Sequence, residues 1–191
     1  MITYVALLRG INVGGNKLIK MADLREVFES SGFKSVRTYI QSGNVIFETR
    51  DSDADKVVRK IEKAIYQSLG HEVTVILRTV AELKNLVEGD HFKHIESEED
   101  VMRFVTFMSA EPLRAPRLPF VIPKENAEIL VIRNRTAFLA CRRKPNGMFS
   151  FPNAFFEKEF GVSATTRNWN TVNKILELVK RLDGPSRPGR G

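Results

Sequence analysis

Apolar and polar positions follow two different periodicities in the first 78 residues. Strands are predicted from continuous or alternating apolar runs, and helices from apolar residues at a spacing of three to four. The predicted strands cover 2–8, 35–41, 45–49 and 72–78, and the predicted helices run from Met21 to Ser31 and from Asp53 to Leu69. The order β-α-β-β-α-β predicts a split βαβ, ferredoxin-like unit whose two helices cover one face of an antiparallel sheet.

The following residues contain a second set of mixed elements. Helices are predicted at 79–87 and from Asn168, and strands at 103–109, 128–132 and 136–141. The segment 111–126 holds four of the eight prolines, which predicts a long exposed connection outside any sheet interior.

The pattern therefore predicts the fold class α+β, with two ferredoxin-like lobes and mainly antiparallel sheets. The first lobe is residues 1–78, and the second, more irregular lobe is residues 79–182. Residues 183–191 are predicted to be a disordered tail. A duplication is suspected, although no sequence repeat relates the lobes.

The stretch LLRGINVGGNK, residues 7–17, follows the first strand and raises the question of phosphate binding. Its glycines do not fit G-x-G-x-x-G, and Lys17 stands one place too late for a P-loop. Glycines still allow backbone amides to face an anion, and Arg9 and Lys17 add positive charge. The alternative is a mobile connection with no ligand.

Two other stretches have a similar polar character, QSGN at 41–44 and TTRNWN at 165–170. Thr165 and Thr166 are good helix N-caps, so Arg167 is predicted beside a helix N-terminus that suits an anion. The alternative is a cap next to an anchoring Trp169. We expected the end of the first strand to lie near Glu48, with the 41–44 turn at the opposite edge of the sheet.

These stretches supply the candidate ligand-binding residues. They are Arg9, Gly10, Asn12, Gly14, Gly15, Lys17, Gln41, Ser42, Asn44, Thr166, Arg167, Asn168 and Trp169. The hypothesis is geometric, because it requires Arg9, Asn12 and Arg167 to face one cleft.

The stretches LRGINVGG, YIQSGNV and TRNWNT together carry a family resemblance. Residues 7–47 and 165–172 resemble the bacterial domain-of-unknown-function family 1697, and the resemblance extends through the last helix. It implies two α+β lobes of ferredoxin-like character. The family's molecular function is unassigned, so the resemblance adds to the fold and leaves the function open.

The net charge of +7, from 30 basic and 23 acidic residues, favours anionic partners. A candidate nucleic-acid patch follows one predicted hairpin, with Phe149 and Phe151 as stacking groups. Its basic residues are Arg133, Arg135, Arg142, Arg143 and Lys144. The alternative is a solvated basic face.

Other features of the sequence argue against a membrane protein, a secreted protein and a metalloprotein. No apolar run reaches the roughly 20 residues of a membrane helix, and the N-terminus does not fit a signal peptide. The single cysteine, Cys141, is expected to be buried and structural. His91 and His94 form a weak metal pair without a third ligand, so no metal or cofactor is predicted. We expect a cytoplasmic protein without membrane contact.

Three functional hypotheses remain open. The first is a binding module for an anionic ligand, either a nucleotide-like small molecule or nucleic acid. The second is an enzyme acting on a small phosphorylated or carboxylated metabolite, with Arg9 and Arg167 clamping the anion. The third is an interaction protein that uses 111–126 and the phenylalanine-rich segment. The sequence does not indicate the oligomeric state.

Overall fold

The computed structural model describes residues 1–13, 17–93, 95, 100–114 and 116–183. Its first sheet has the strand order β2-β3-β1-β4, and its pairs are antiparallel. The elements of the first lobe are β1 (Ile2–Leu8), α1 (Met21–Ser30), β2 (Lys34–Tyr39), β3 (Asn44–Thr49), α2 (Ala54–Leu69) and β4 (Val75–Thr79). The split βαβ prediction for the first lobe is confirmed.

The second sheet has the order β6-β7-β8-β5-β9 and is also antiparallel. Its lobe contains α3 (Val80–Val87), β5 (Val101–Met108), β6 (Phe120–Ile122), a short 3-10 helix η1 (Pro123–Glu125), β7 (Ala127–Arg133), β8 (Thr136–Arg142), α4 (Asn153–Phe160), β9 (Ala164–Asn168) and α5 (Trp169–Asp183). The predicted α+β class with two antiparallel sheets is confirmed.

The two sheets share one pattern of strand connection. The central strands β1 and β5 each pair with the strand that begins after a hairpin turn, and each also pairs with the last strand of its lobe. A helix then follows that last strand, α3 after β4 and α5 after β9. The second lobe differs because β6 and the short 3-10 helix η1, rather than an α-helix, lie between β5 and β7 among the described residues.

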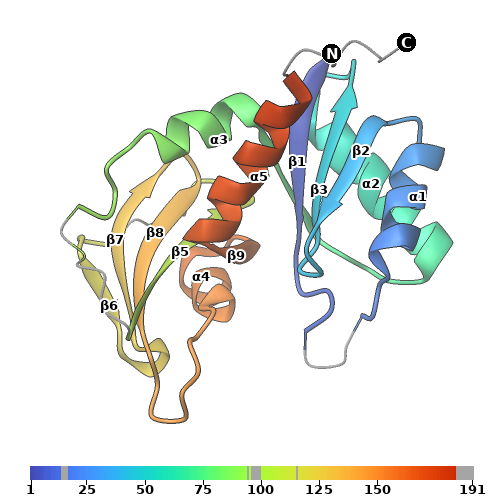
Figure 1. Cartoon of the computed structure of the whole chain (residues 1–191). Helices are drawn as coiled ribbons and strands as arrows, with labels where there is room; N and C mark the ends of the chain where they lie inside the picture. Colours follow the sequence, from blue (N-terminus) through green and yellow to red (C-terminus); the bar gives the residue numbers. More distant parts are fainter. Residues whose placement is uncertain (14–16, 94, 96–99, 115, 184–191) are drawn as a thin grey trace.

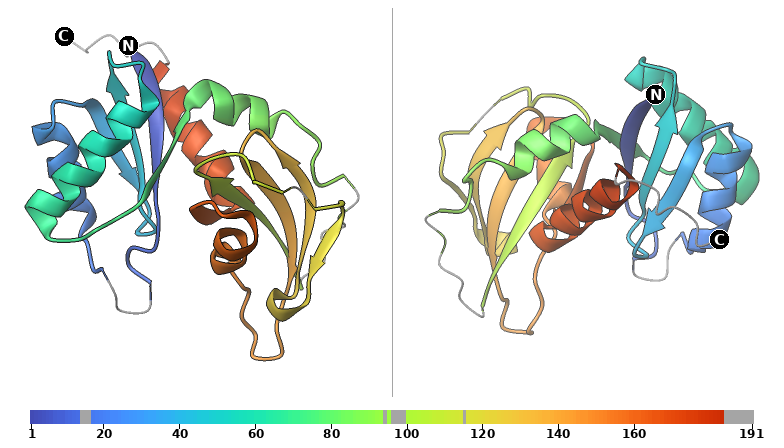
Figure 2. Two further views of the ribbon diagram at one scale, coloured as in Figure 1. Left: turned by 180° about the vertical axis from the view of Figure 1, so that it is seen from behind. Right: turned by 45° about the horizontal axis from the view of Figure 1, so that its top comes forward.

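The helices and sheets form stacked layers (Figure 1). Helices α1 and α2 cover the outer face of the first sheet around Phe28, Phe47 and Ile61. Helices α3 and α5 lie between the sheets, where both sheets and both helices contribute to one core. Helix α4 covers the remaining face of the second sheet through Phe156 and Phe160. Figure 2 shows the same arrangement from behind and from above.

Local sequence signals account for the helix boundaries. Asp53 caps α2 by accepting a hydrogen bond from the Lys56 amide, and Gly70 ends that helix in the left-handed conformation. Thr79 and Glu82 form the reciprocal capping box predicted for the start of α3. The α3 start matters for the site below, because α3 begins two residues after Arg78, which is the next-to-last residue of β4.

Three expectations need correction. Leu7 lies opposite Asn44, so the 41–44 turn is beside the end of β1 and not at the opposite edge. Antiparallel pairing places the end of one strand next to the start of its neighbour. Thr165 and Thr166 are not helix caps, because they lie in β9, where β-branched side chains suit a strand. The segment 111–126 is not wholly an exposed connection, since β6 adds an edge strand and buries Ile122.

Among the described residues, we find no helix with the length and apolar character needed to cross a membrane.

The shared core predicts that the first lobe is incomplete without the second. Separating residues 1–78 would expose Val5, Leu7, Ile46 and Ile76, which are at most 2% exposed in the whole chain. Burying such a side chain contributes about 1.5–3 kcal/mol. We therefore expect the isolated fragment 1–78 to melt with little cooperativity and to bind a hydrophobic dye. A sharp calorimetric transition for this fragment would contradict the expectation.

Candidate functional site

Arg167 holds β9 to the first lobe through a buried guanidinium. It is 5% exposed. Its Nε donates to Asn44 Oδ1 at 2.6 Å, and its Nη2 donates to the Leu8 and Ser42 carbonyl oxygens at 2.8 and 2.9 Å. Nη1 donates to the Thr165 hydroxyl and the Thr166 carbonyl. Burial lowers the pKa of Arg167 to about 10, so the side chain stays charged at neutral pH.

Arg78 makes the reverse connection, from β4 to the second lobe. It is 2% exposed, and its Nη2 donates to the carbonyl oxygens of Met108 at 2.8 Å and Arg135 at 2.7 Å. Its Nη1 donates to the Leu77 carbonyl. Nε is buried and has no hydrogen-bond partner among the described residues. Burial first, and then the neighbouring Arg135, lower the pKa of Arg78 to about 10.

The residues around the glycine-containing loop are held by neighbouring segments. The Nε and Nη2 of Arg9 donate to the two carboxylate oxygens of Glu157. Asn12 donates to the carbonyls of Ile19 and Gln41, and Lys17 donates to the Glu72 carbonyl. Gly10 has a positive φ of 66°. Gly14 and Gly15 lie outside the described residues.

The other predicted residues lie on the segments that Arg167 connects. Ser42 and Asn44 contribute acceptors to its guanidinium, and the Gln41 side chain is exposed. Thr166 hydrogen-bonds Thr106 and Asn153 inside the second lobe.

Asn168 and Trp169 mark the start of the last helix. The Asn168 side chain accepts from the Asn170 amide at the start of α5. The Trp169 ring contacts the rings of Phe92 and Phe138. The structure thus brings segments 8–12, 41–44 and 165–169 together, and in it their polar groups bond mainly to one another.

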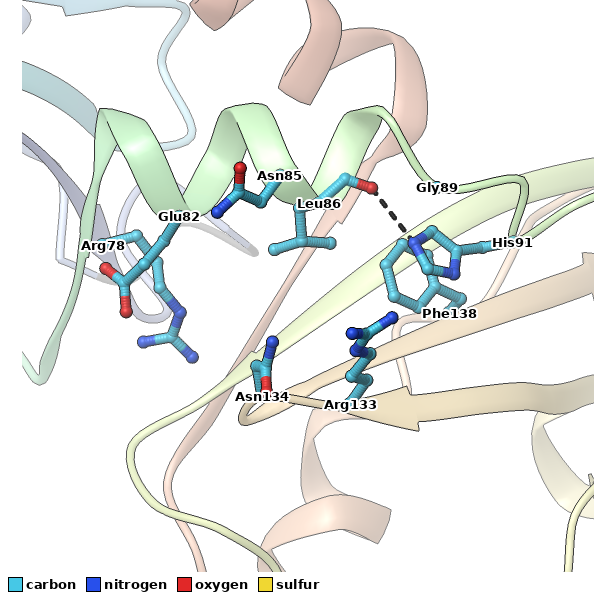
Figure 3. Close-up of a pocket in the computed structure, with 9 residues that line it drawn as sticks. All are labelled: Arg78, Glu82, Asn85, Leu86, Gly89, His91, Arg133, Asn134 and Phe138. Carbon is cyan, nitrogen blue, oxygen red and sulfur yellow. Dashed lines mark hydrogen bonds between the residues drawn. The ribbon is translucent and has the colours of Figure 1, made fainter.

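A cavity of about 270 Å³ lies at the Arg78 connection instead, between α3 and the β7–β8 hairpin. Its lining residues are Arg78, Glu82, Asn85, Leu86, Gly89, His91, Arg133, Asn134 and Phe138. Figure 3 shows Arg78 and Arg133 approaching it from opposite sides, with the α3 side chains above and Asn134 below.

The cavity has a mixed polar and apolar lining, and it carries more positive than negative side chains. Arg78 and Arg133 face a single carboxylate, Glu82, which is already engaged in the α3 capping box and by Arg135. The side chains of Arg133 and Asn134 hydrogen-bond no other residue in the described part of the chain. An oxygen-bearing anion is therefore the ligand whose charge this cavity suits.

His91 closes one end of the cavity as a neutral ring. Its Nε2 lies 3.1 Å from the Leu86 carbonyl and donates to it, and its ring stacks on Phe138 with centroids 3.7 Å apart. Burial lowers the pKa of His91, and nearby Arg133 acts in the same direction. Nδ1 is consequently a hydrogen-bond acceptor at neutral pH.

The five basic residues predicted to form one nucleic-acid patch are divided between the two ends of a hairpin. Arg133 and Arg135 flank the β7–β8 turn, whereas Arg142 ends β8 and is followed by Arg143 and Lys144. A seven-residue strand separates them by roughly 20 Å. Arg135, Arg143 and Lys144 also contact carboxylates of Glu82, Asp100 and Glu125. The five residues thus lie on or beside one hairpin as expected but are divided between its two ends, and nucleic-acid binding by them stays a prediction.

Sequence reasoning missed Arg78 and the α3 residues of the cavity. The sequence did contain one signal, in LRTVAEL and TRNWNTV. Arg78 and Arg167 are each the next-to-last residue of a strand, and a helix begins two residues after each of them. A charged residue inside an apolar strand needs buried partners. His91 was considered only as a metal ligand with His94, which lies outside the described residues.

Comparisons with known proteins agree with the fold. A family model described as "Protein of unknown function (DUF1697)" matches residues 1–138. The matched range covers the first two motifs of the resemblance and ends before 165–172. A solved structure of the conserved bacterial protein SP0830 from Streptococcus pneumoniae is similar, with a TM-score of 0.65 and 23% identity over 94% of this chain and 99% of that chain. No curated protein matches.

The Arg167 contacts predict a large stability cost for removing its charge. Arg167→Met would leave several buried carbonyls and Asn44 without a donor, and unmet buried groups cost about 1–3 kcal/mol each. We expect a loss of at least about 3 kcal/mol in urea unfolding. Arg9→Met is the matched control, because the Arg9 side chain is 35% exposed and its ion pair contributes about 1 kcal/mol or less. Equal losses for the two variants would contradict a structural role specific to Arg167.

Proposed function

Because the chain belongs to the DUF1697 family of proteins of unknown function, we propose its role from its own geometry: it is a binding module for a small anionic ligand. The ligand occupies the cavity between α3 and the β7–β8 hairpin. Arg133 and Asn134 bind its acid group from the hairpin turn, and Arg78 supplies buried positive charge.

The observation that carries this proposal is the Arg78 guanidinium. It is buried at the cavity, it is charged at neutral pH, and within the described chain no carboxylate pairs with it at ion-pair distance. A buried charge is ordinarily compensated by an opposite charge or by a full set of hydrogen bonds. Arg78 lacks both, since its Nε is unpaired in the described structure.

A small ligand fits these residues better than nucleic acid does. Single-stranded nucleic acid binds along an extended basic groove with exposed aromatic rings. Here the basic residues are divided between two ends of one hairpin, and three of the five contact carboxylates. We therefore favour a nucleotide-sized acid, and oligonucleotide binding becomes one outcome of the test.

The structure suggests a different role for the candidate ligand-binding residues around Arg9 and Arg167. Arg9 pairs with Glu157, and Arg167 is surrounded by carbonyl and side-chain oxygens, so the charge of each is already engaged within the protein. We propose that these residues fix how the two lobes pack. Direct ligand contact by Asn12 or Trp169 stays a prediction.

The enzyme hypothesis receives less support from the cavity. His91 provides a neutral ring with an acceptor nitrogen, which suits a general base. None of the nine lining residues, however, is a hydroxyl, thiol or amine nucleophile, and the Glu82 carboxylate is held by the α3 cap. Binding without chemistry is therefore the function that the cavity supports best.

The proposal predicts that Arg133→Gln weakens binding of a phosphorylated probe. Titrating adenosine monophosphate and inorganic phosphate by NMR should shift the Arg133 and Asn134 signals, and Arg133→Gln should raise Kd about tenfold, as expected for losing a charged hydrogen bond. Arg143→Gln is the matched control, because Arg143 lies at the other end of the hairpin and contacts Asp100.

Native mass spectrometry of the purified chain should also detect a co-purifying acid. The proposal is overturned if neither probe shifts cavity signals, or if Arg143→Gln weakens binding as much as Arg133→Gln. Tight, salt-sensitive binding of a twelve-nucleotide DNA that ignores Arg133→Gln would favour the nucleic-acid function instead.

A further inference from the structure

The two lobes repeat one arrangement down to individual hydrogen bonds. Leu7 lies opposite Asn44 and Leu8 opposite Val75, and in the second lobe Phe107 lies opposite Thr136 and Met108 opposite Ala164. The strand ends β1 and β5 are tied in the same way to the adjoining turn. The Leu8 amide donates to the Gly43 carbonyl at 2.8 Å, and the Met108 amide donates to the Arg135 carbonyl at 2.9 Å.

Arg78 and Arg167 occupy equivalent positions in this repeat. Arg78 lies opposite Val5 and Arg167 opposite Val105. Each guanidinium reaches the other lobe and binds the carbonyl at the end of its central strand, Leu8 or Met108. Each also binds a carbonyl in the adjoining hairpin turn. We call these two arrangements the Arg167 clasp and the Arg78 clasp.

The two clasps differ at two side-chain acceptors. The Thr165 hydroxyl accepts from Nη1 of Arg167, whereas the equivalent residue two places before Arg78 is Ile76, which has no acceptor. In the Arg167 clasp, Asn44 at the start of β3 accepts from Nε. The equivalent first residue of β8 is Thr136, whose shorter side chain donates to the Asn134 carbonyl instead. Within the described parts of the chain the Nε of Arg78 has no hydrogen-bond partner, and the cavity lies at this clasp. The repeat therefore identifies which hydrogen-bond partners the Arg78 clasp lacks.

We propose that an oxyanion bound in the cavity, a carboxylate or a phosphate, supplies the acceptor that Thr136 does not, and that it thereby locks the two lobes together at Arg78. This inference rests on the proposed function and adds its consequence for the fold. Nε is buried and has no hydrogen-bond partner among the described residues, and Arg78 lines the cavity. The proposal requires the cavity wall to move enough for an oxygen of the bound acid to reach Nε. Ligand binding thus couples to lobe packing at one clasp only.

Hydrogen exchange in the intact chain measures this coupling directly. The Met108 amide reports on the Arg78 clasp, and the Leu8 amide is its internal control at the Arg167 clasp. Sodium phosphate and sodium acetate serve as the two probes, each balanced with sodium chloride to constant ionic strength. At saturation we expect exchange of Met108 to slow about tenfold, while Leu8 is unchanged. A response to one probe alone identifies phosphate or carboxylate as the ligand's acid group.

A reciprocal pair of substitutions tests the missing acceptor itself. Thr136→Asn introduces a side-chain amide oxygen as an acceptor for Arg78 Nε at nearly constant side-chain volume. It should raise Tm in the absence of either probe, and it should remove most of the probe's effect on the hydrogen exchange of the Met108 amide. Asn44→Thr removes the acceptor from the other clasp and should lower Tm, because Arg167 Nε then lacks its partner.

The outcomes separate the two proposals. Binding that depends on Arg133 but leaves Met108 exchange unchanged overturns the locking inference and retains the proposed function. A Thr136→Asn chain that responds to the probe like the wild type also overturns it. If Thr136→Asn does not fold, the exchange measurement on the wild-type chain decides alone. The absence of any Arg133-dependent binding overturns both proposals.

Discussion

The packing of the two lobes depends on hydrogen-bonding two buried guanidinium groups. Arg78 and Arg167 are charged and almost inaccessible, so each needs acceptors aimed at it from fixed backbone. Those acceptors are carbonyl oxygens at the end of a central strand and in a hairpin turn of the opposite lobe. Each arginine therefore fixes the position of one lobe relative to the other more narrowly than apolar packing of α3 and α5 could.

This constraint explains the polar stretches that follow the strands. Gly43 has a φ of 76°, and a Cβ there would lie 2.6 Å from the Ile11 side chain, so the turn that presents its carbonyls to Arg167 requires glycine. Asn44 lies under that turn with no exposed surface and serves the same guanidinium. Asn12 ties the loop after β1 to the turn through the Gln41 carbonyl. The polar residues at 41–44 resemble part of a ligand-binding loop in sequence. In the structure they supply or support the acceptors of the Arg167 clasp.

The sequence predicted most of the fold and little of the site, for a physical reason. Periodicity and caps such as Asp53, Thr79 and Gly70 report on local structure, so the first lobe's elements and their order could be predicted. Whether Arg167 binds an anion or a set of carbonyls depends on contacts between residues more than 120 positions apart, with Asn44 for example. The 165–168 segment was misassigned because Thr165 and Thr166 suit both a helix cap and a strand, and only pairing with β5 decides.

The difference in hydrogen-bond acceptors between the two clasps is the reason for proposing an anion in the cavity. If both lobes supplied the same acceptors, both buried guanidinium groups would have all these hydrogen bonds, and no N–H donor would be left for an anion. Here two side-chain acceptors of the Arg167 clasp, those of Asn44 and Thr165, have no counterpart at Arg78. The resulting deficit coincides with the cavity that Arg133 and Asn134 border. An unpaired donor at the same place as a basic cavity is costly to keep unless something occupies it. Under the proposed lock, the Arg167 clasp joins the lobes without a ligand, and an anion strengthens the Arg78 clasp.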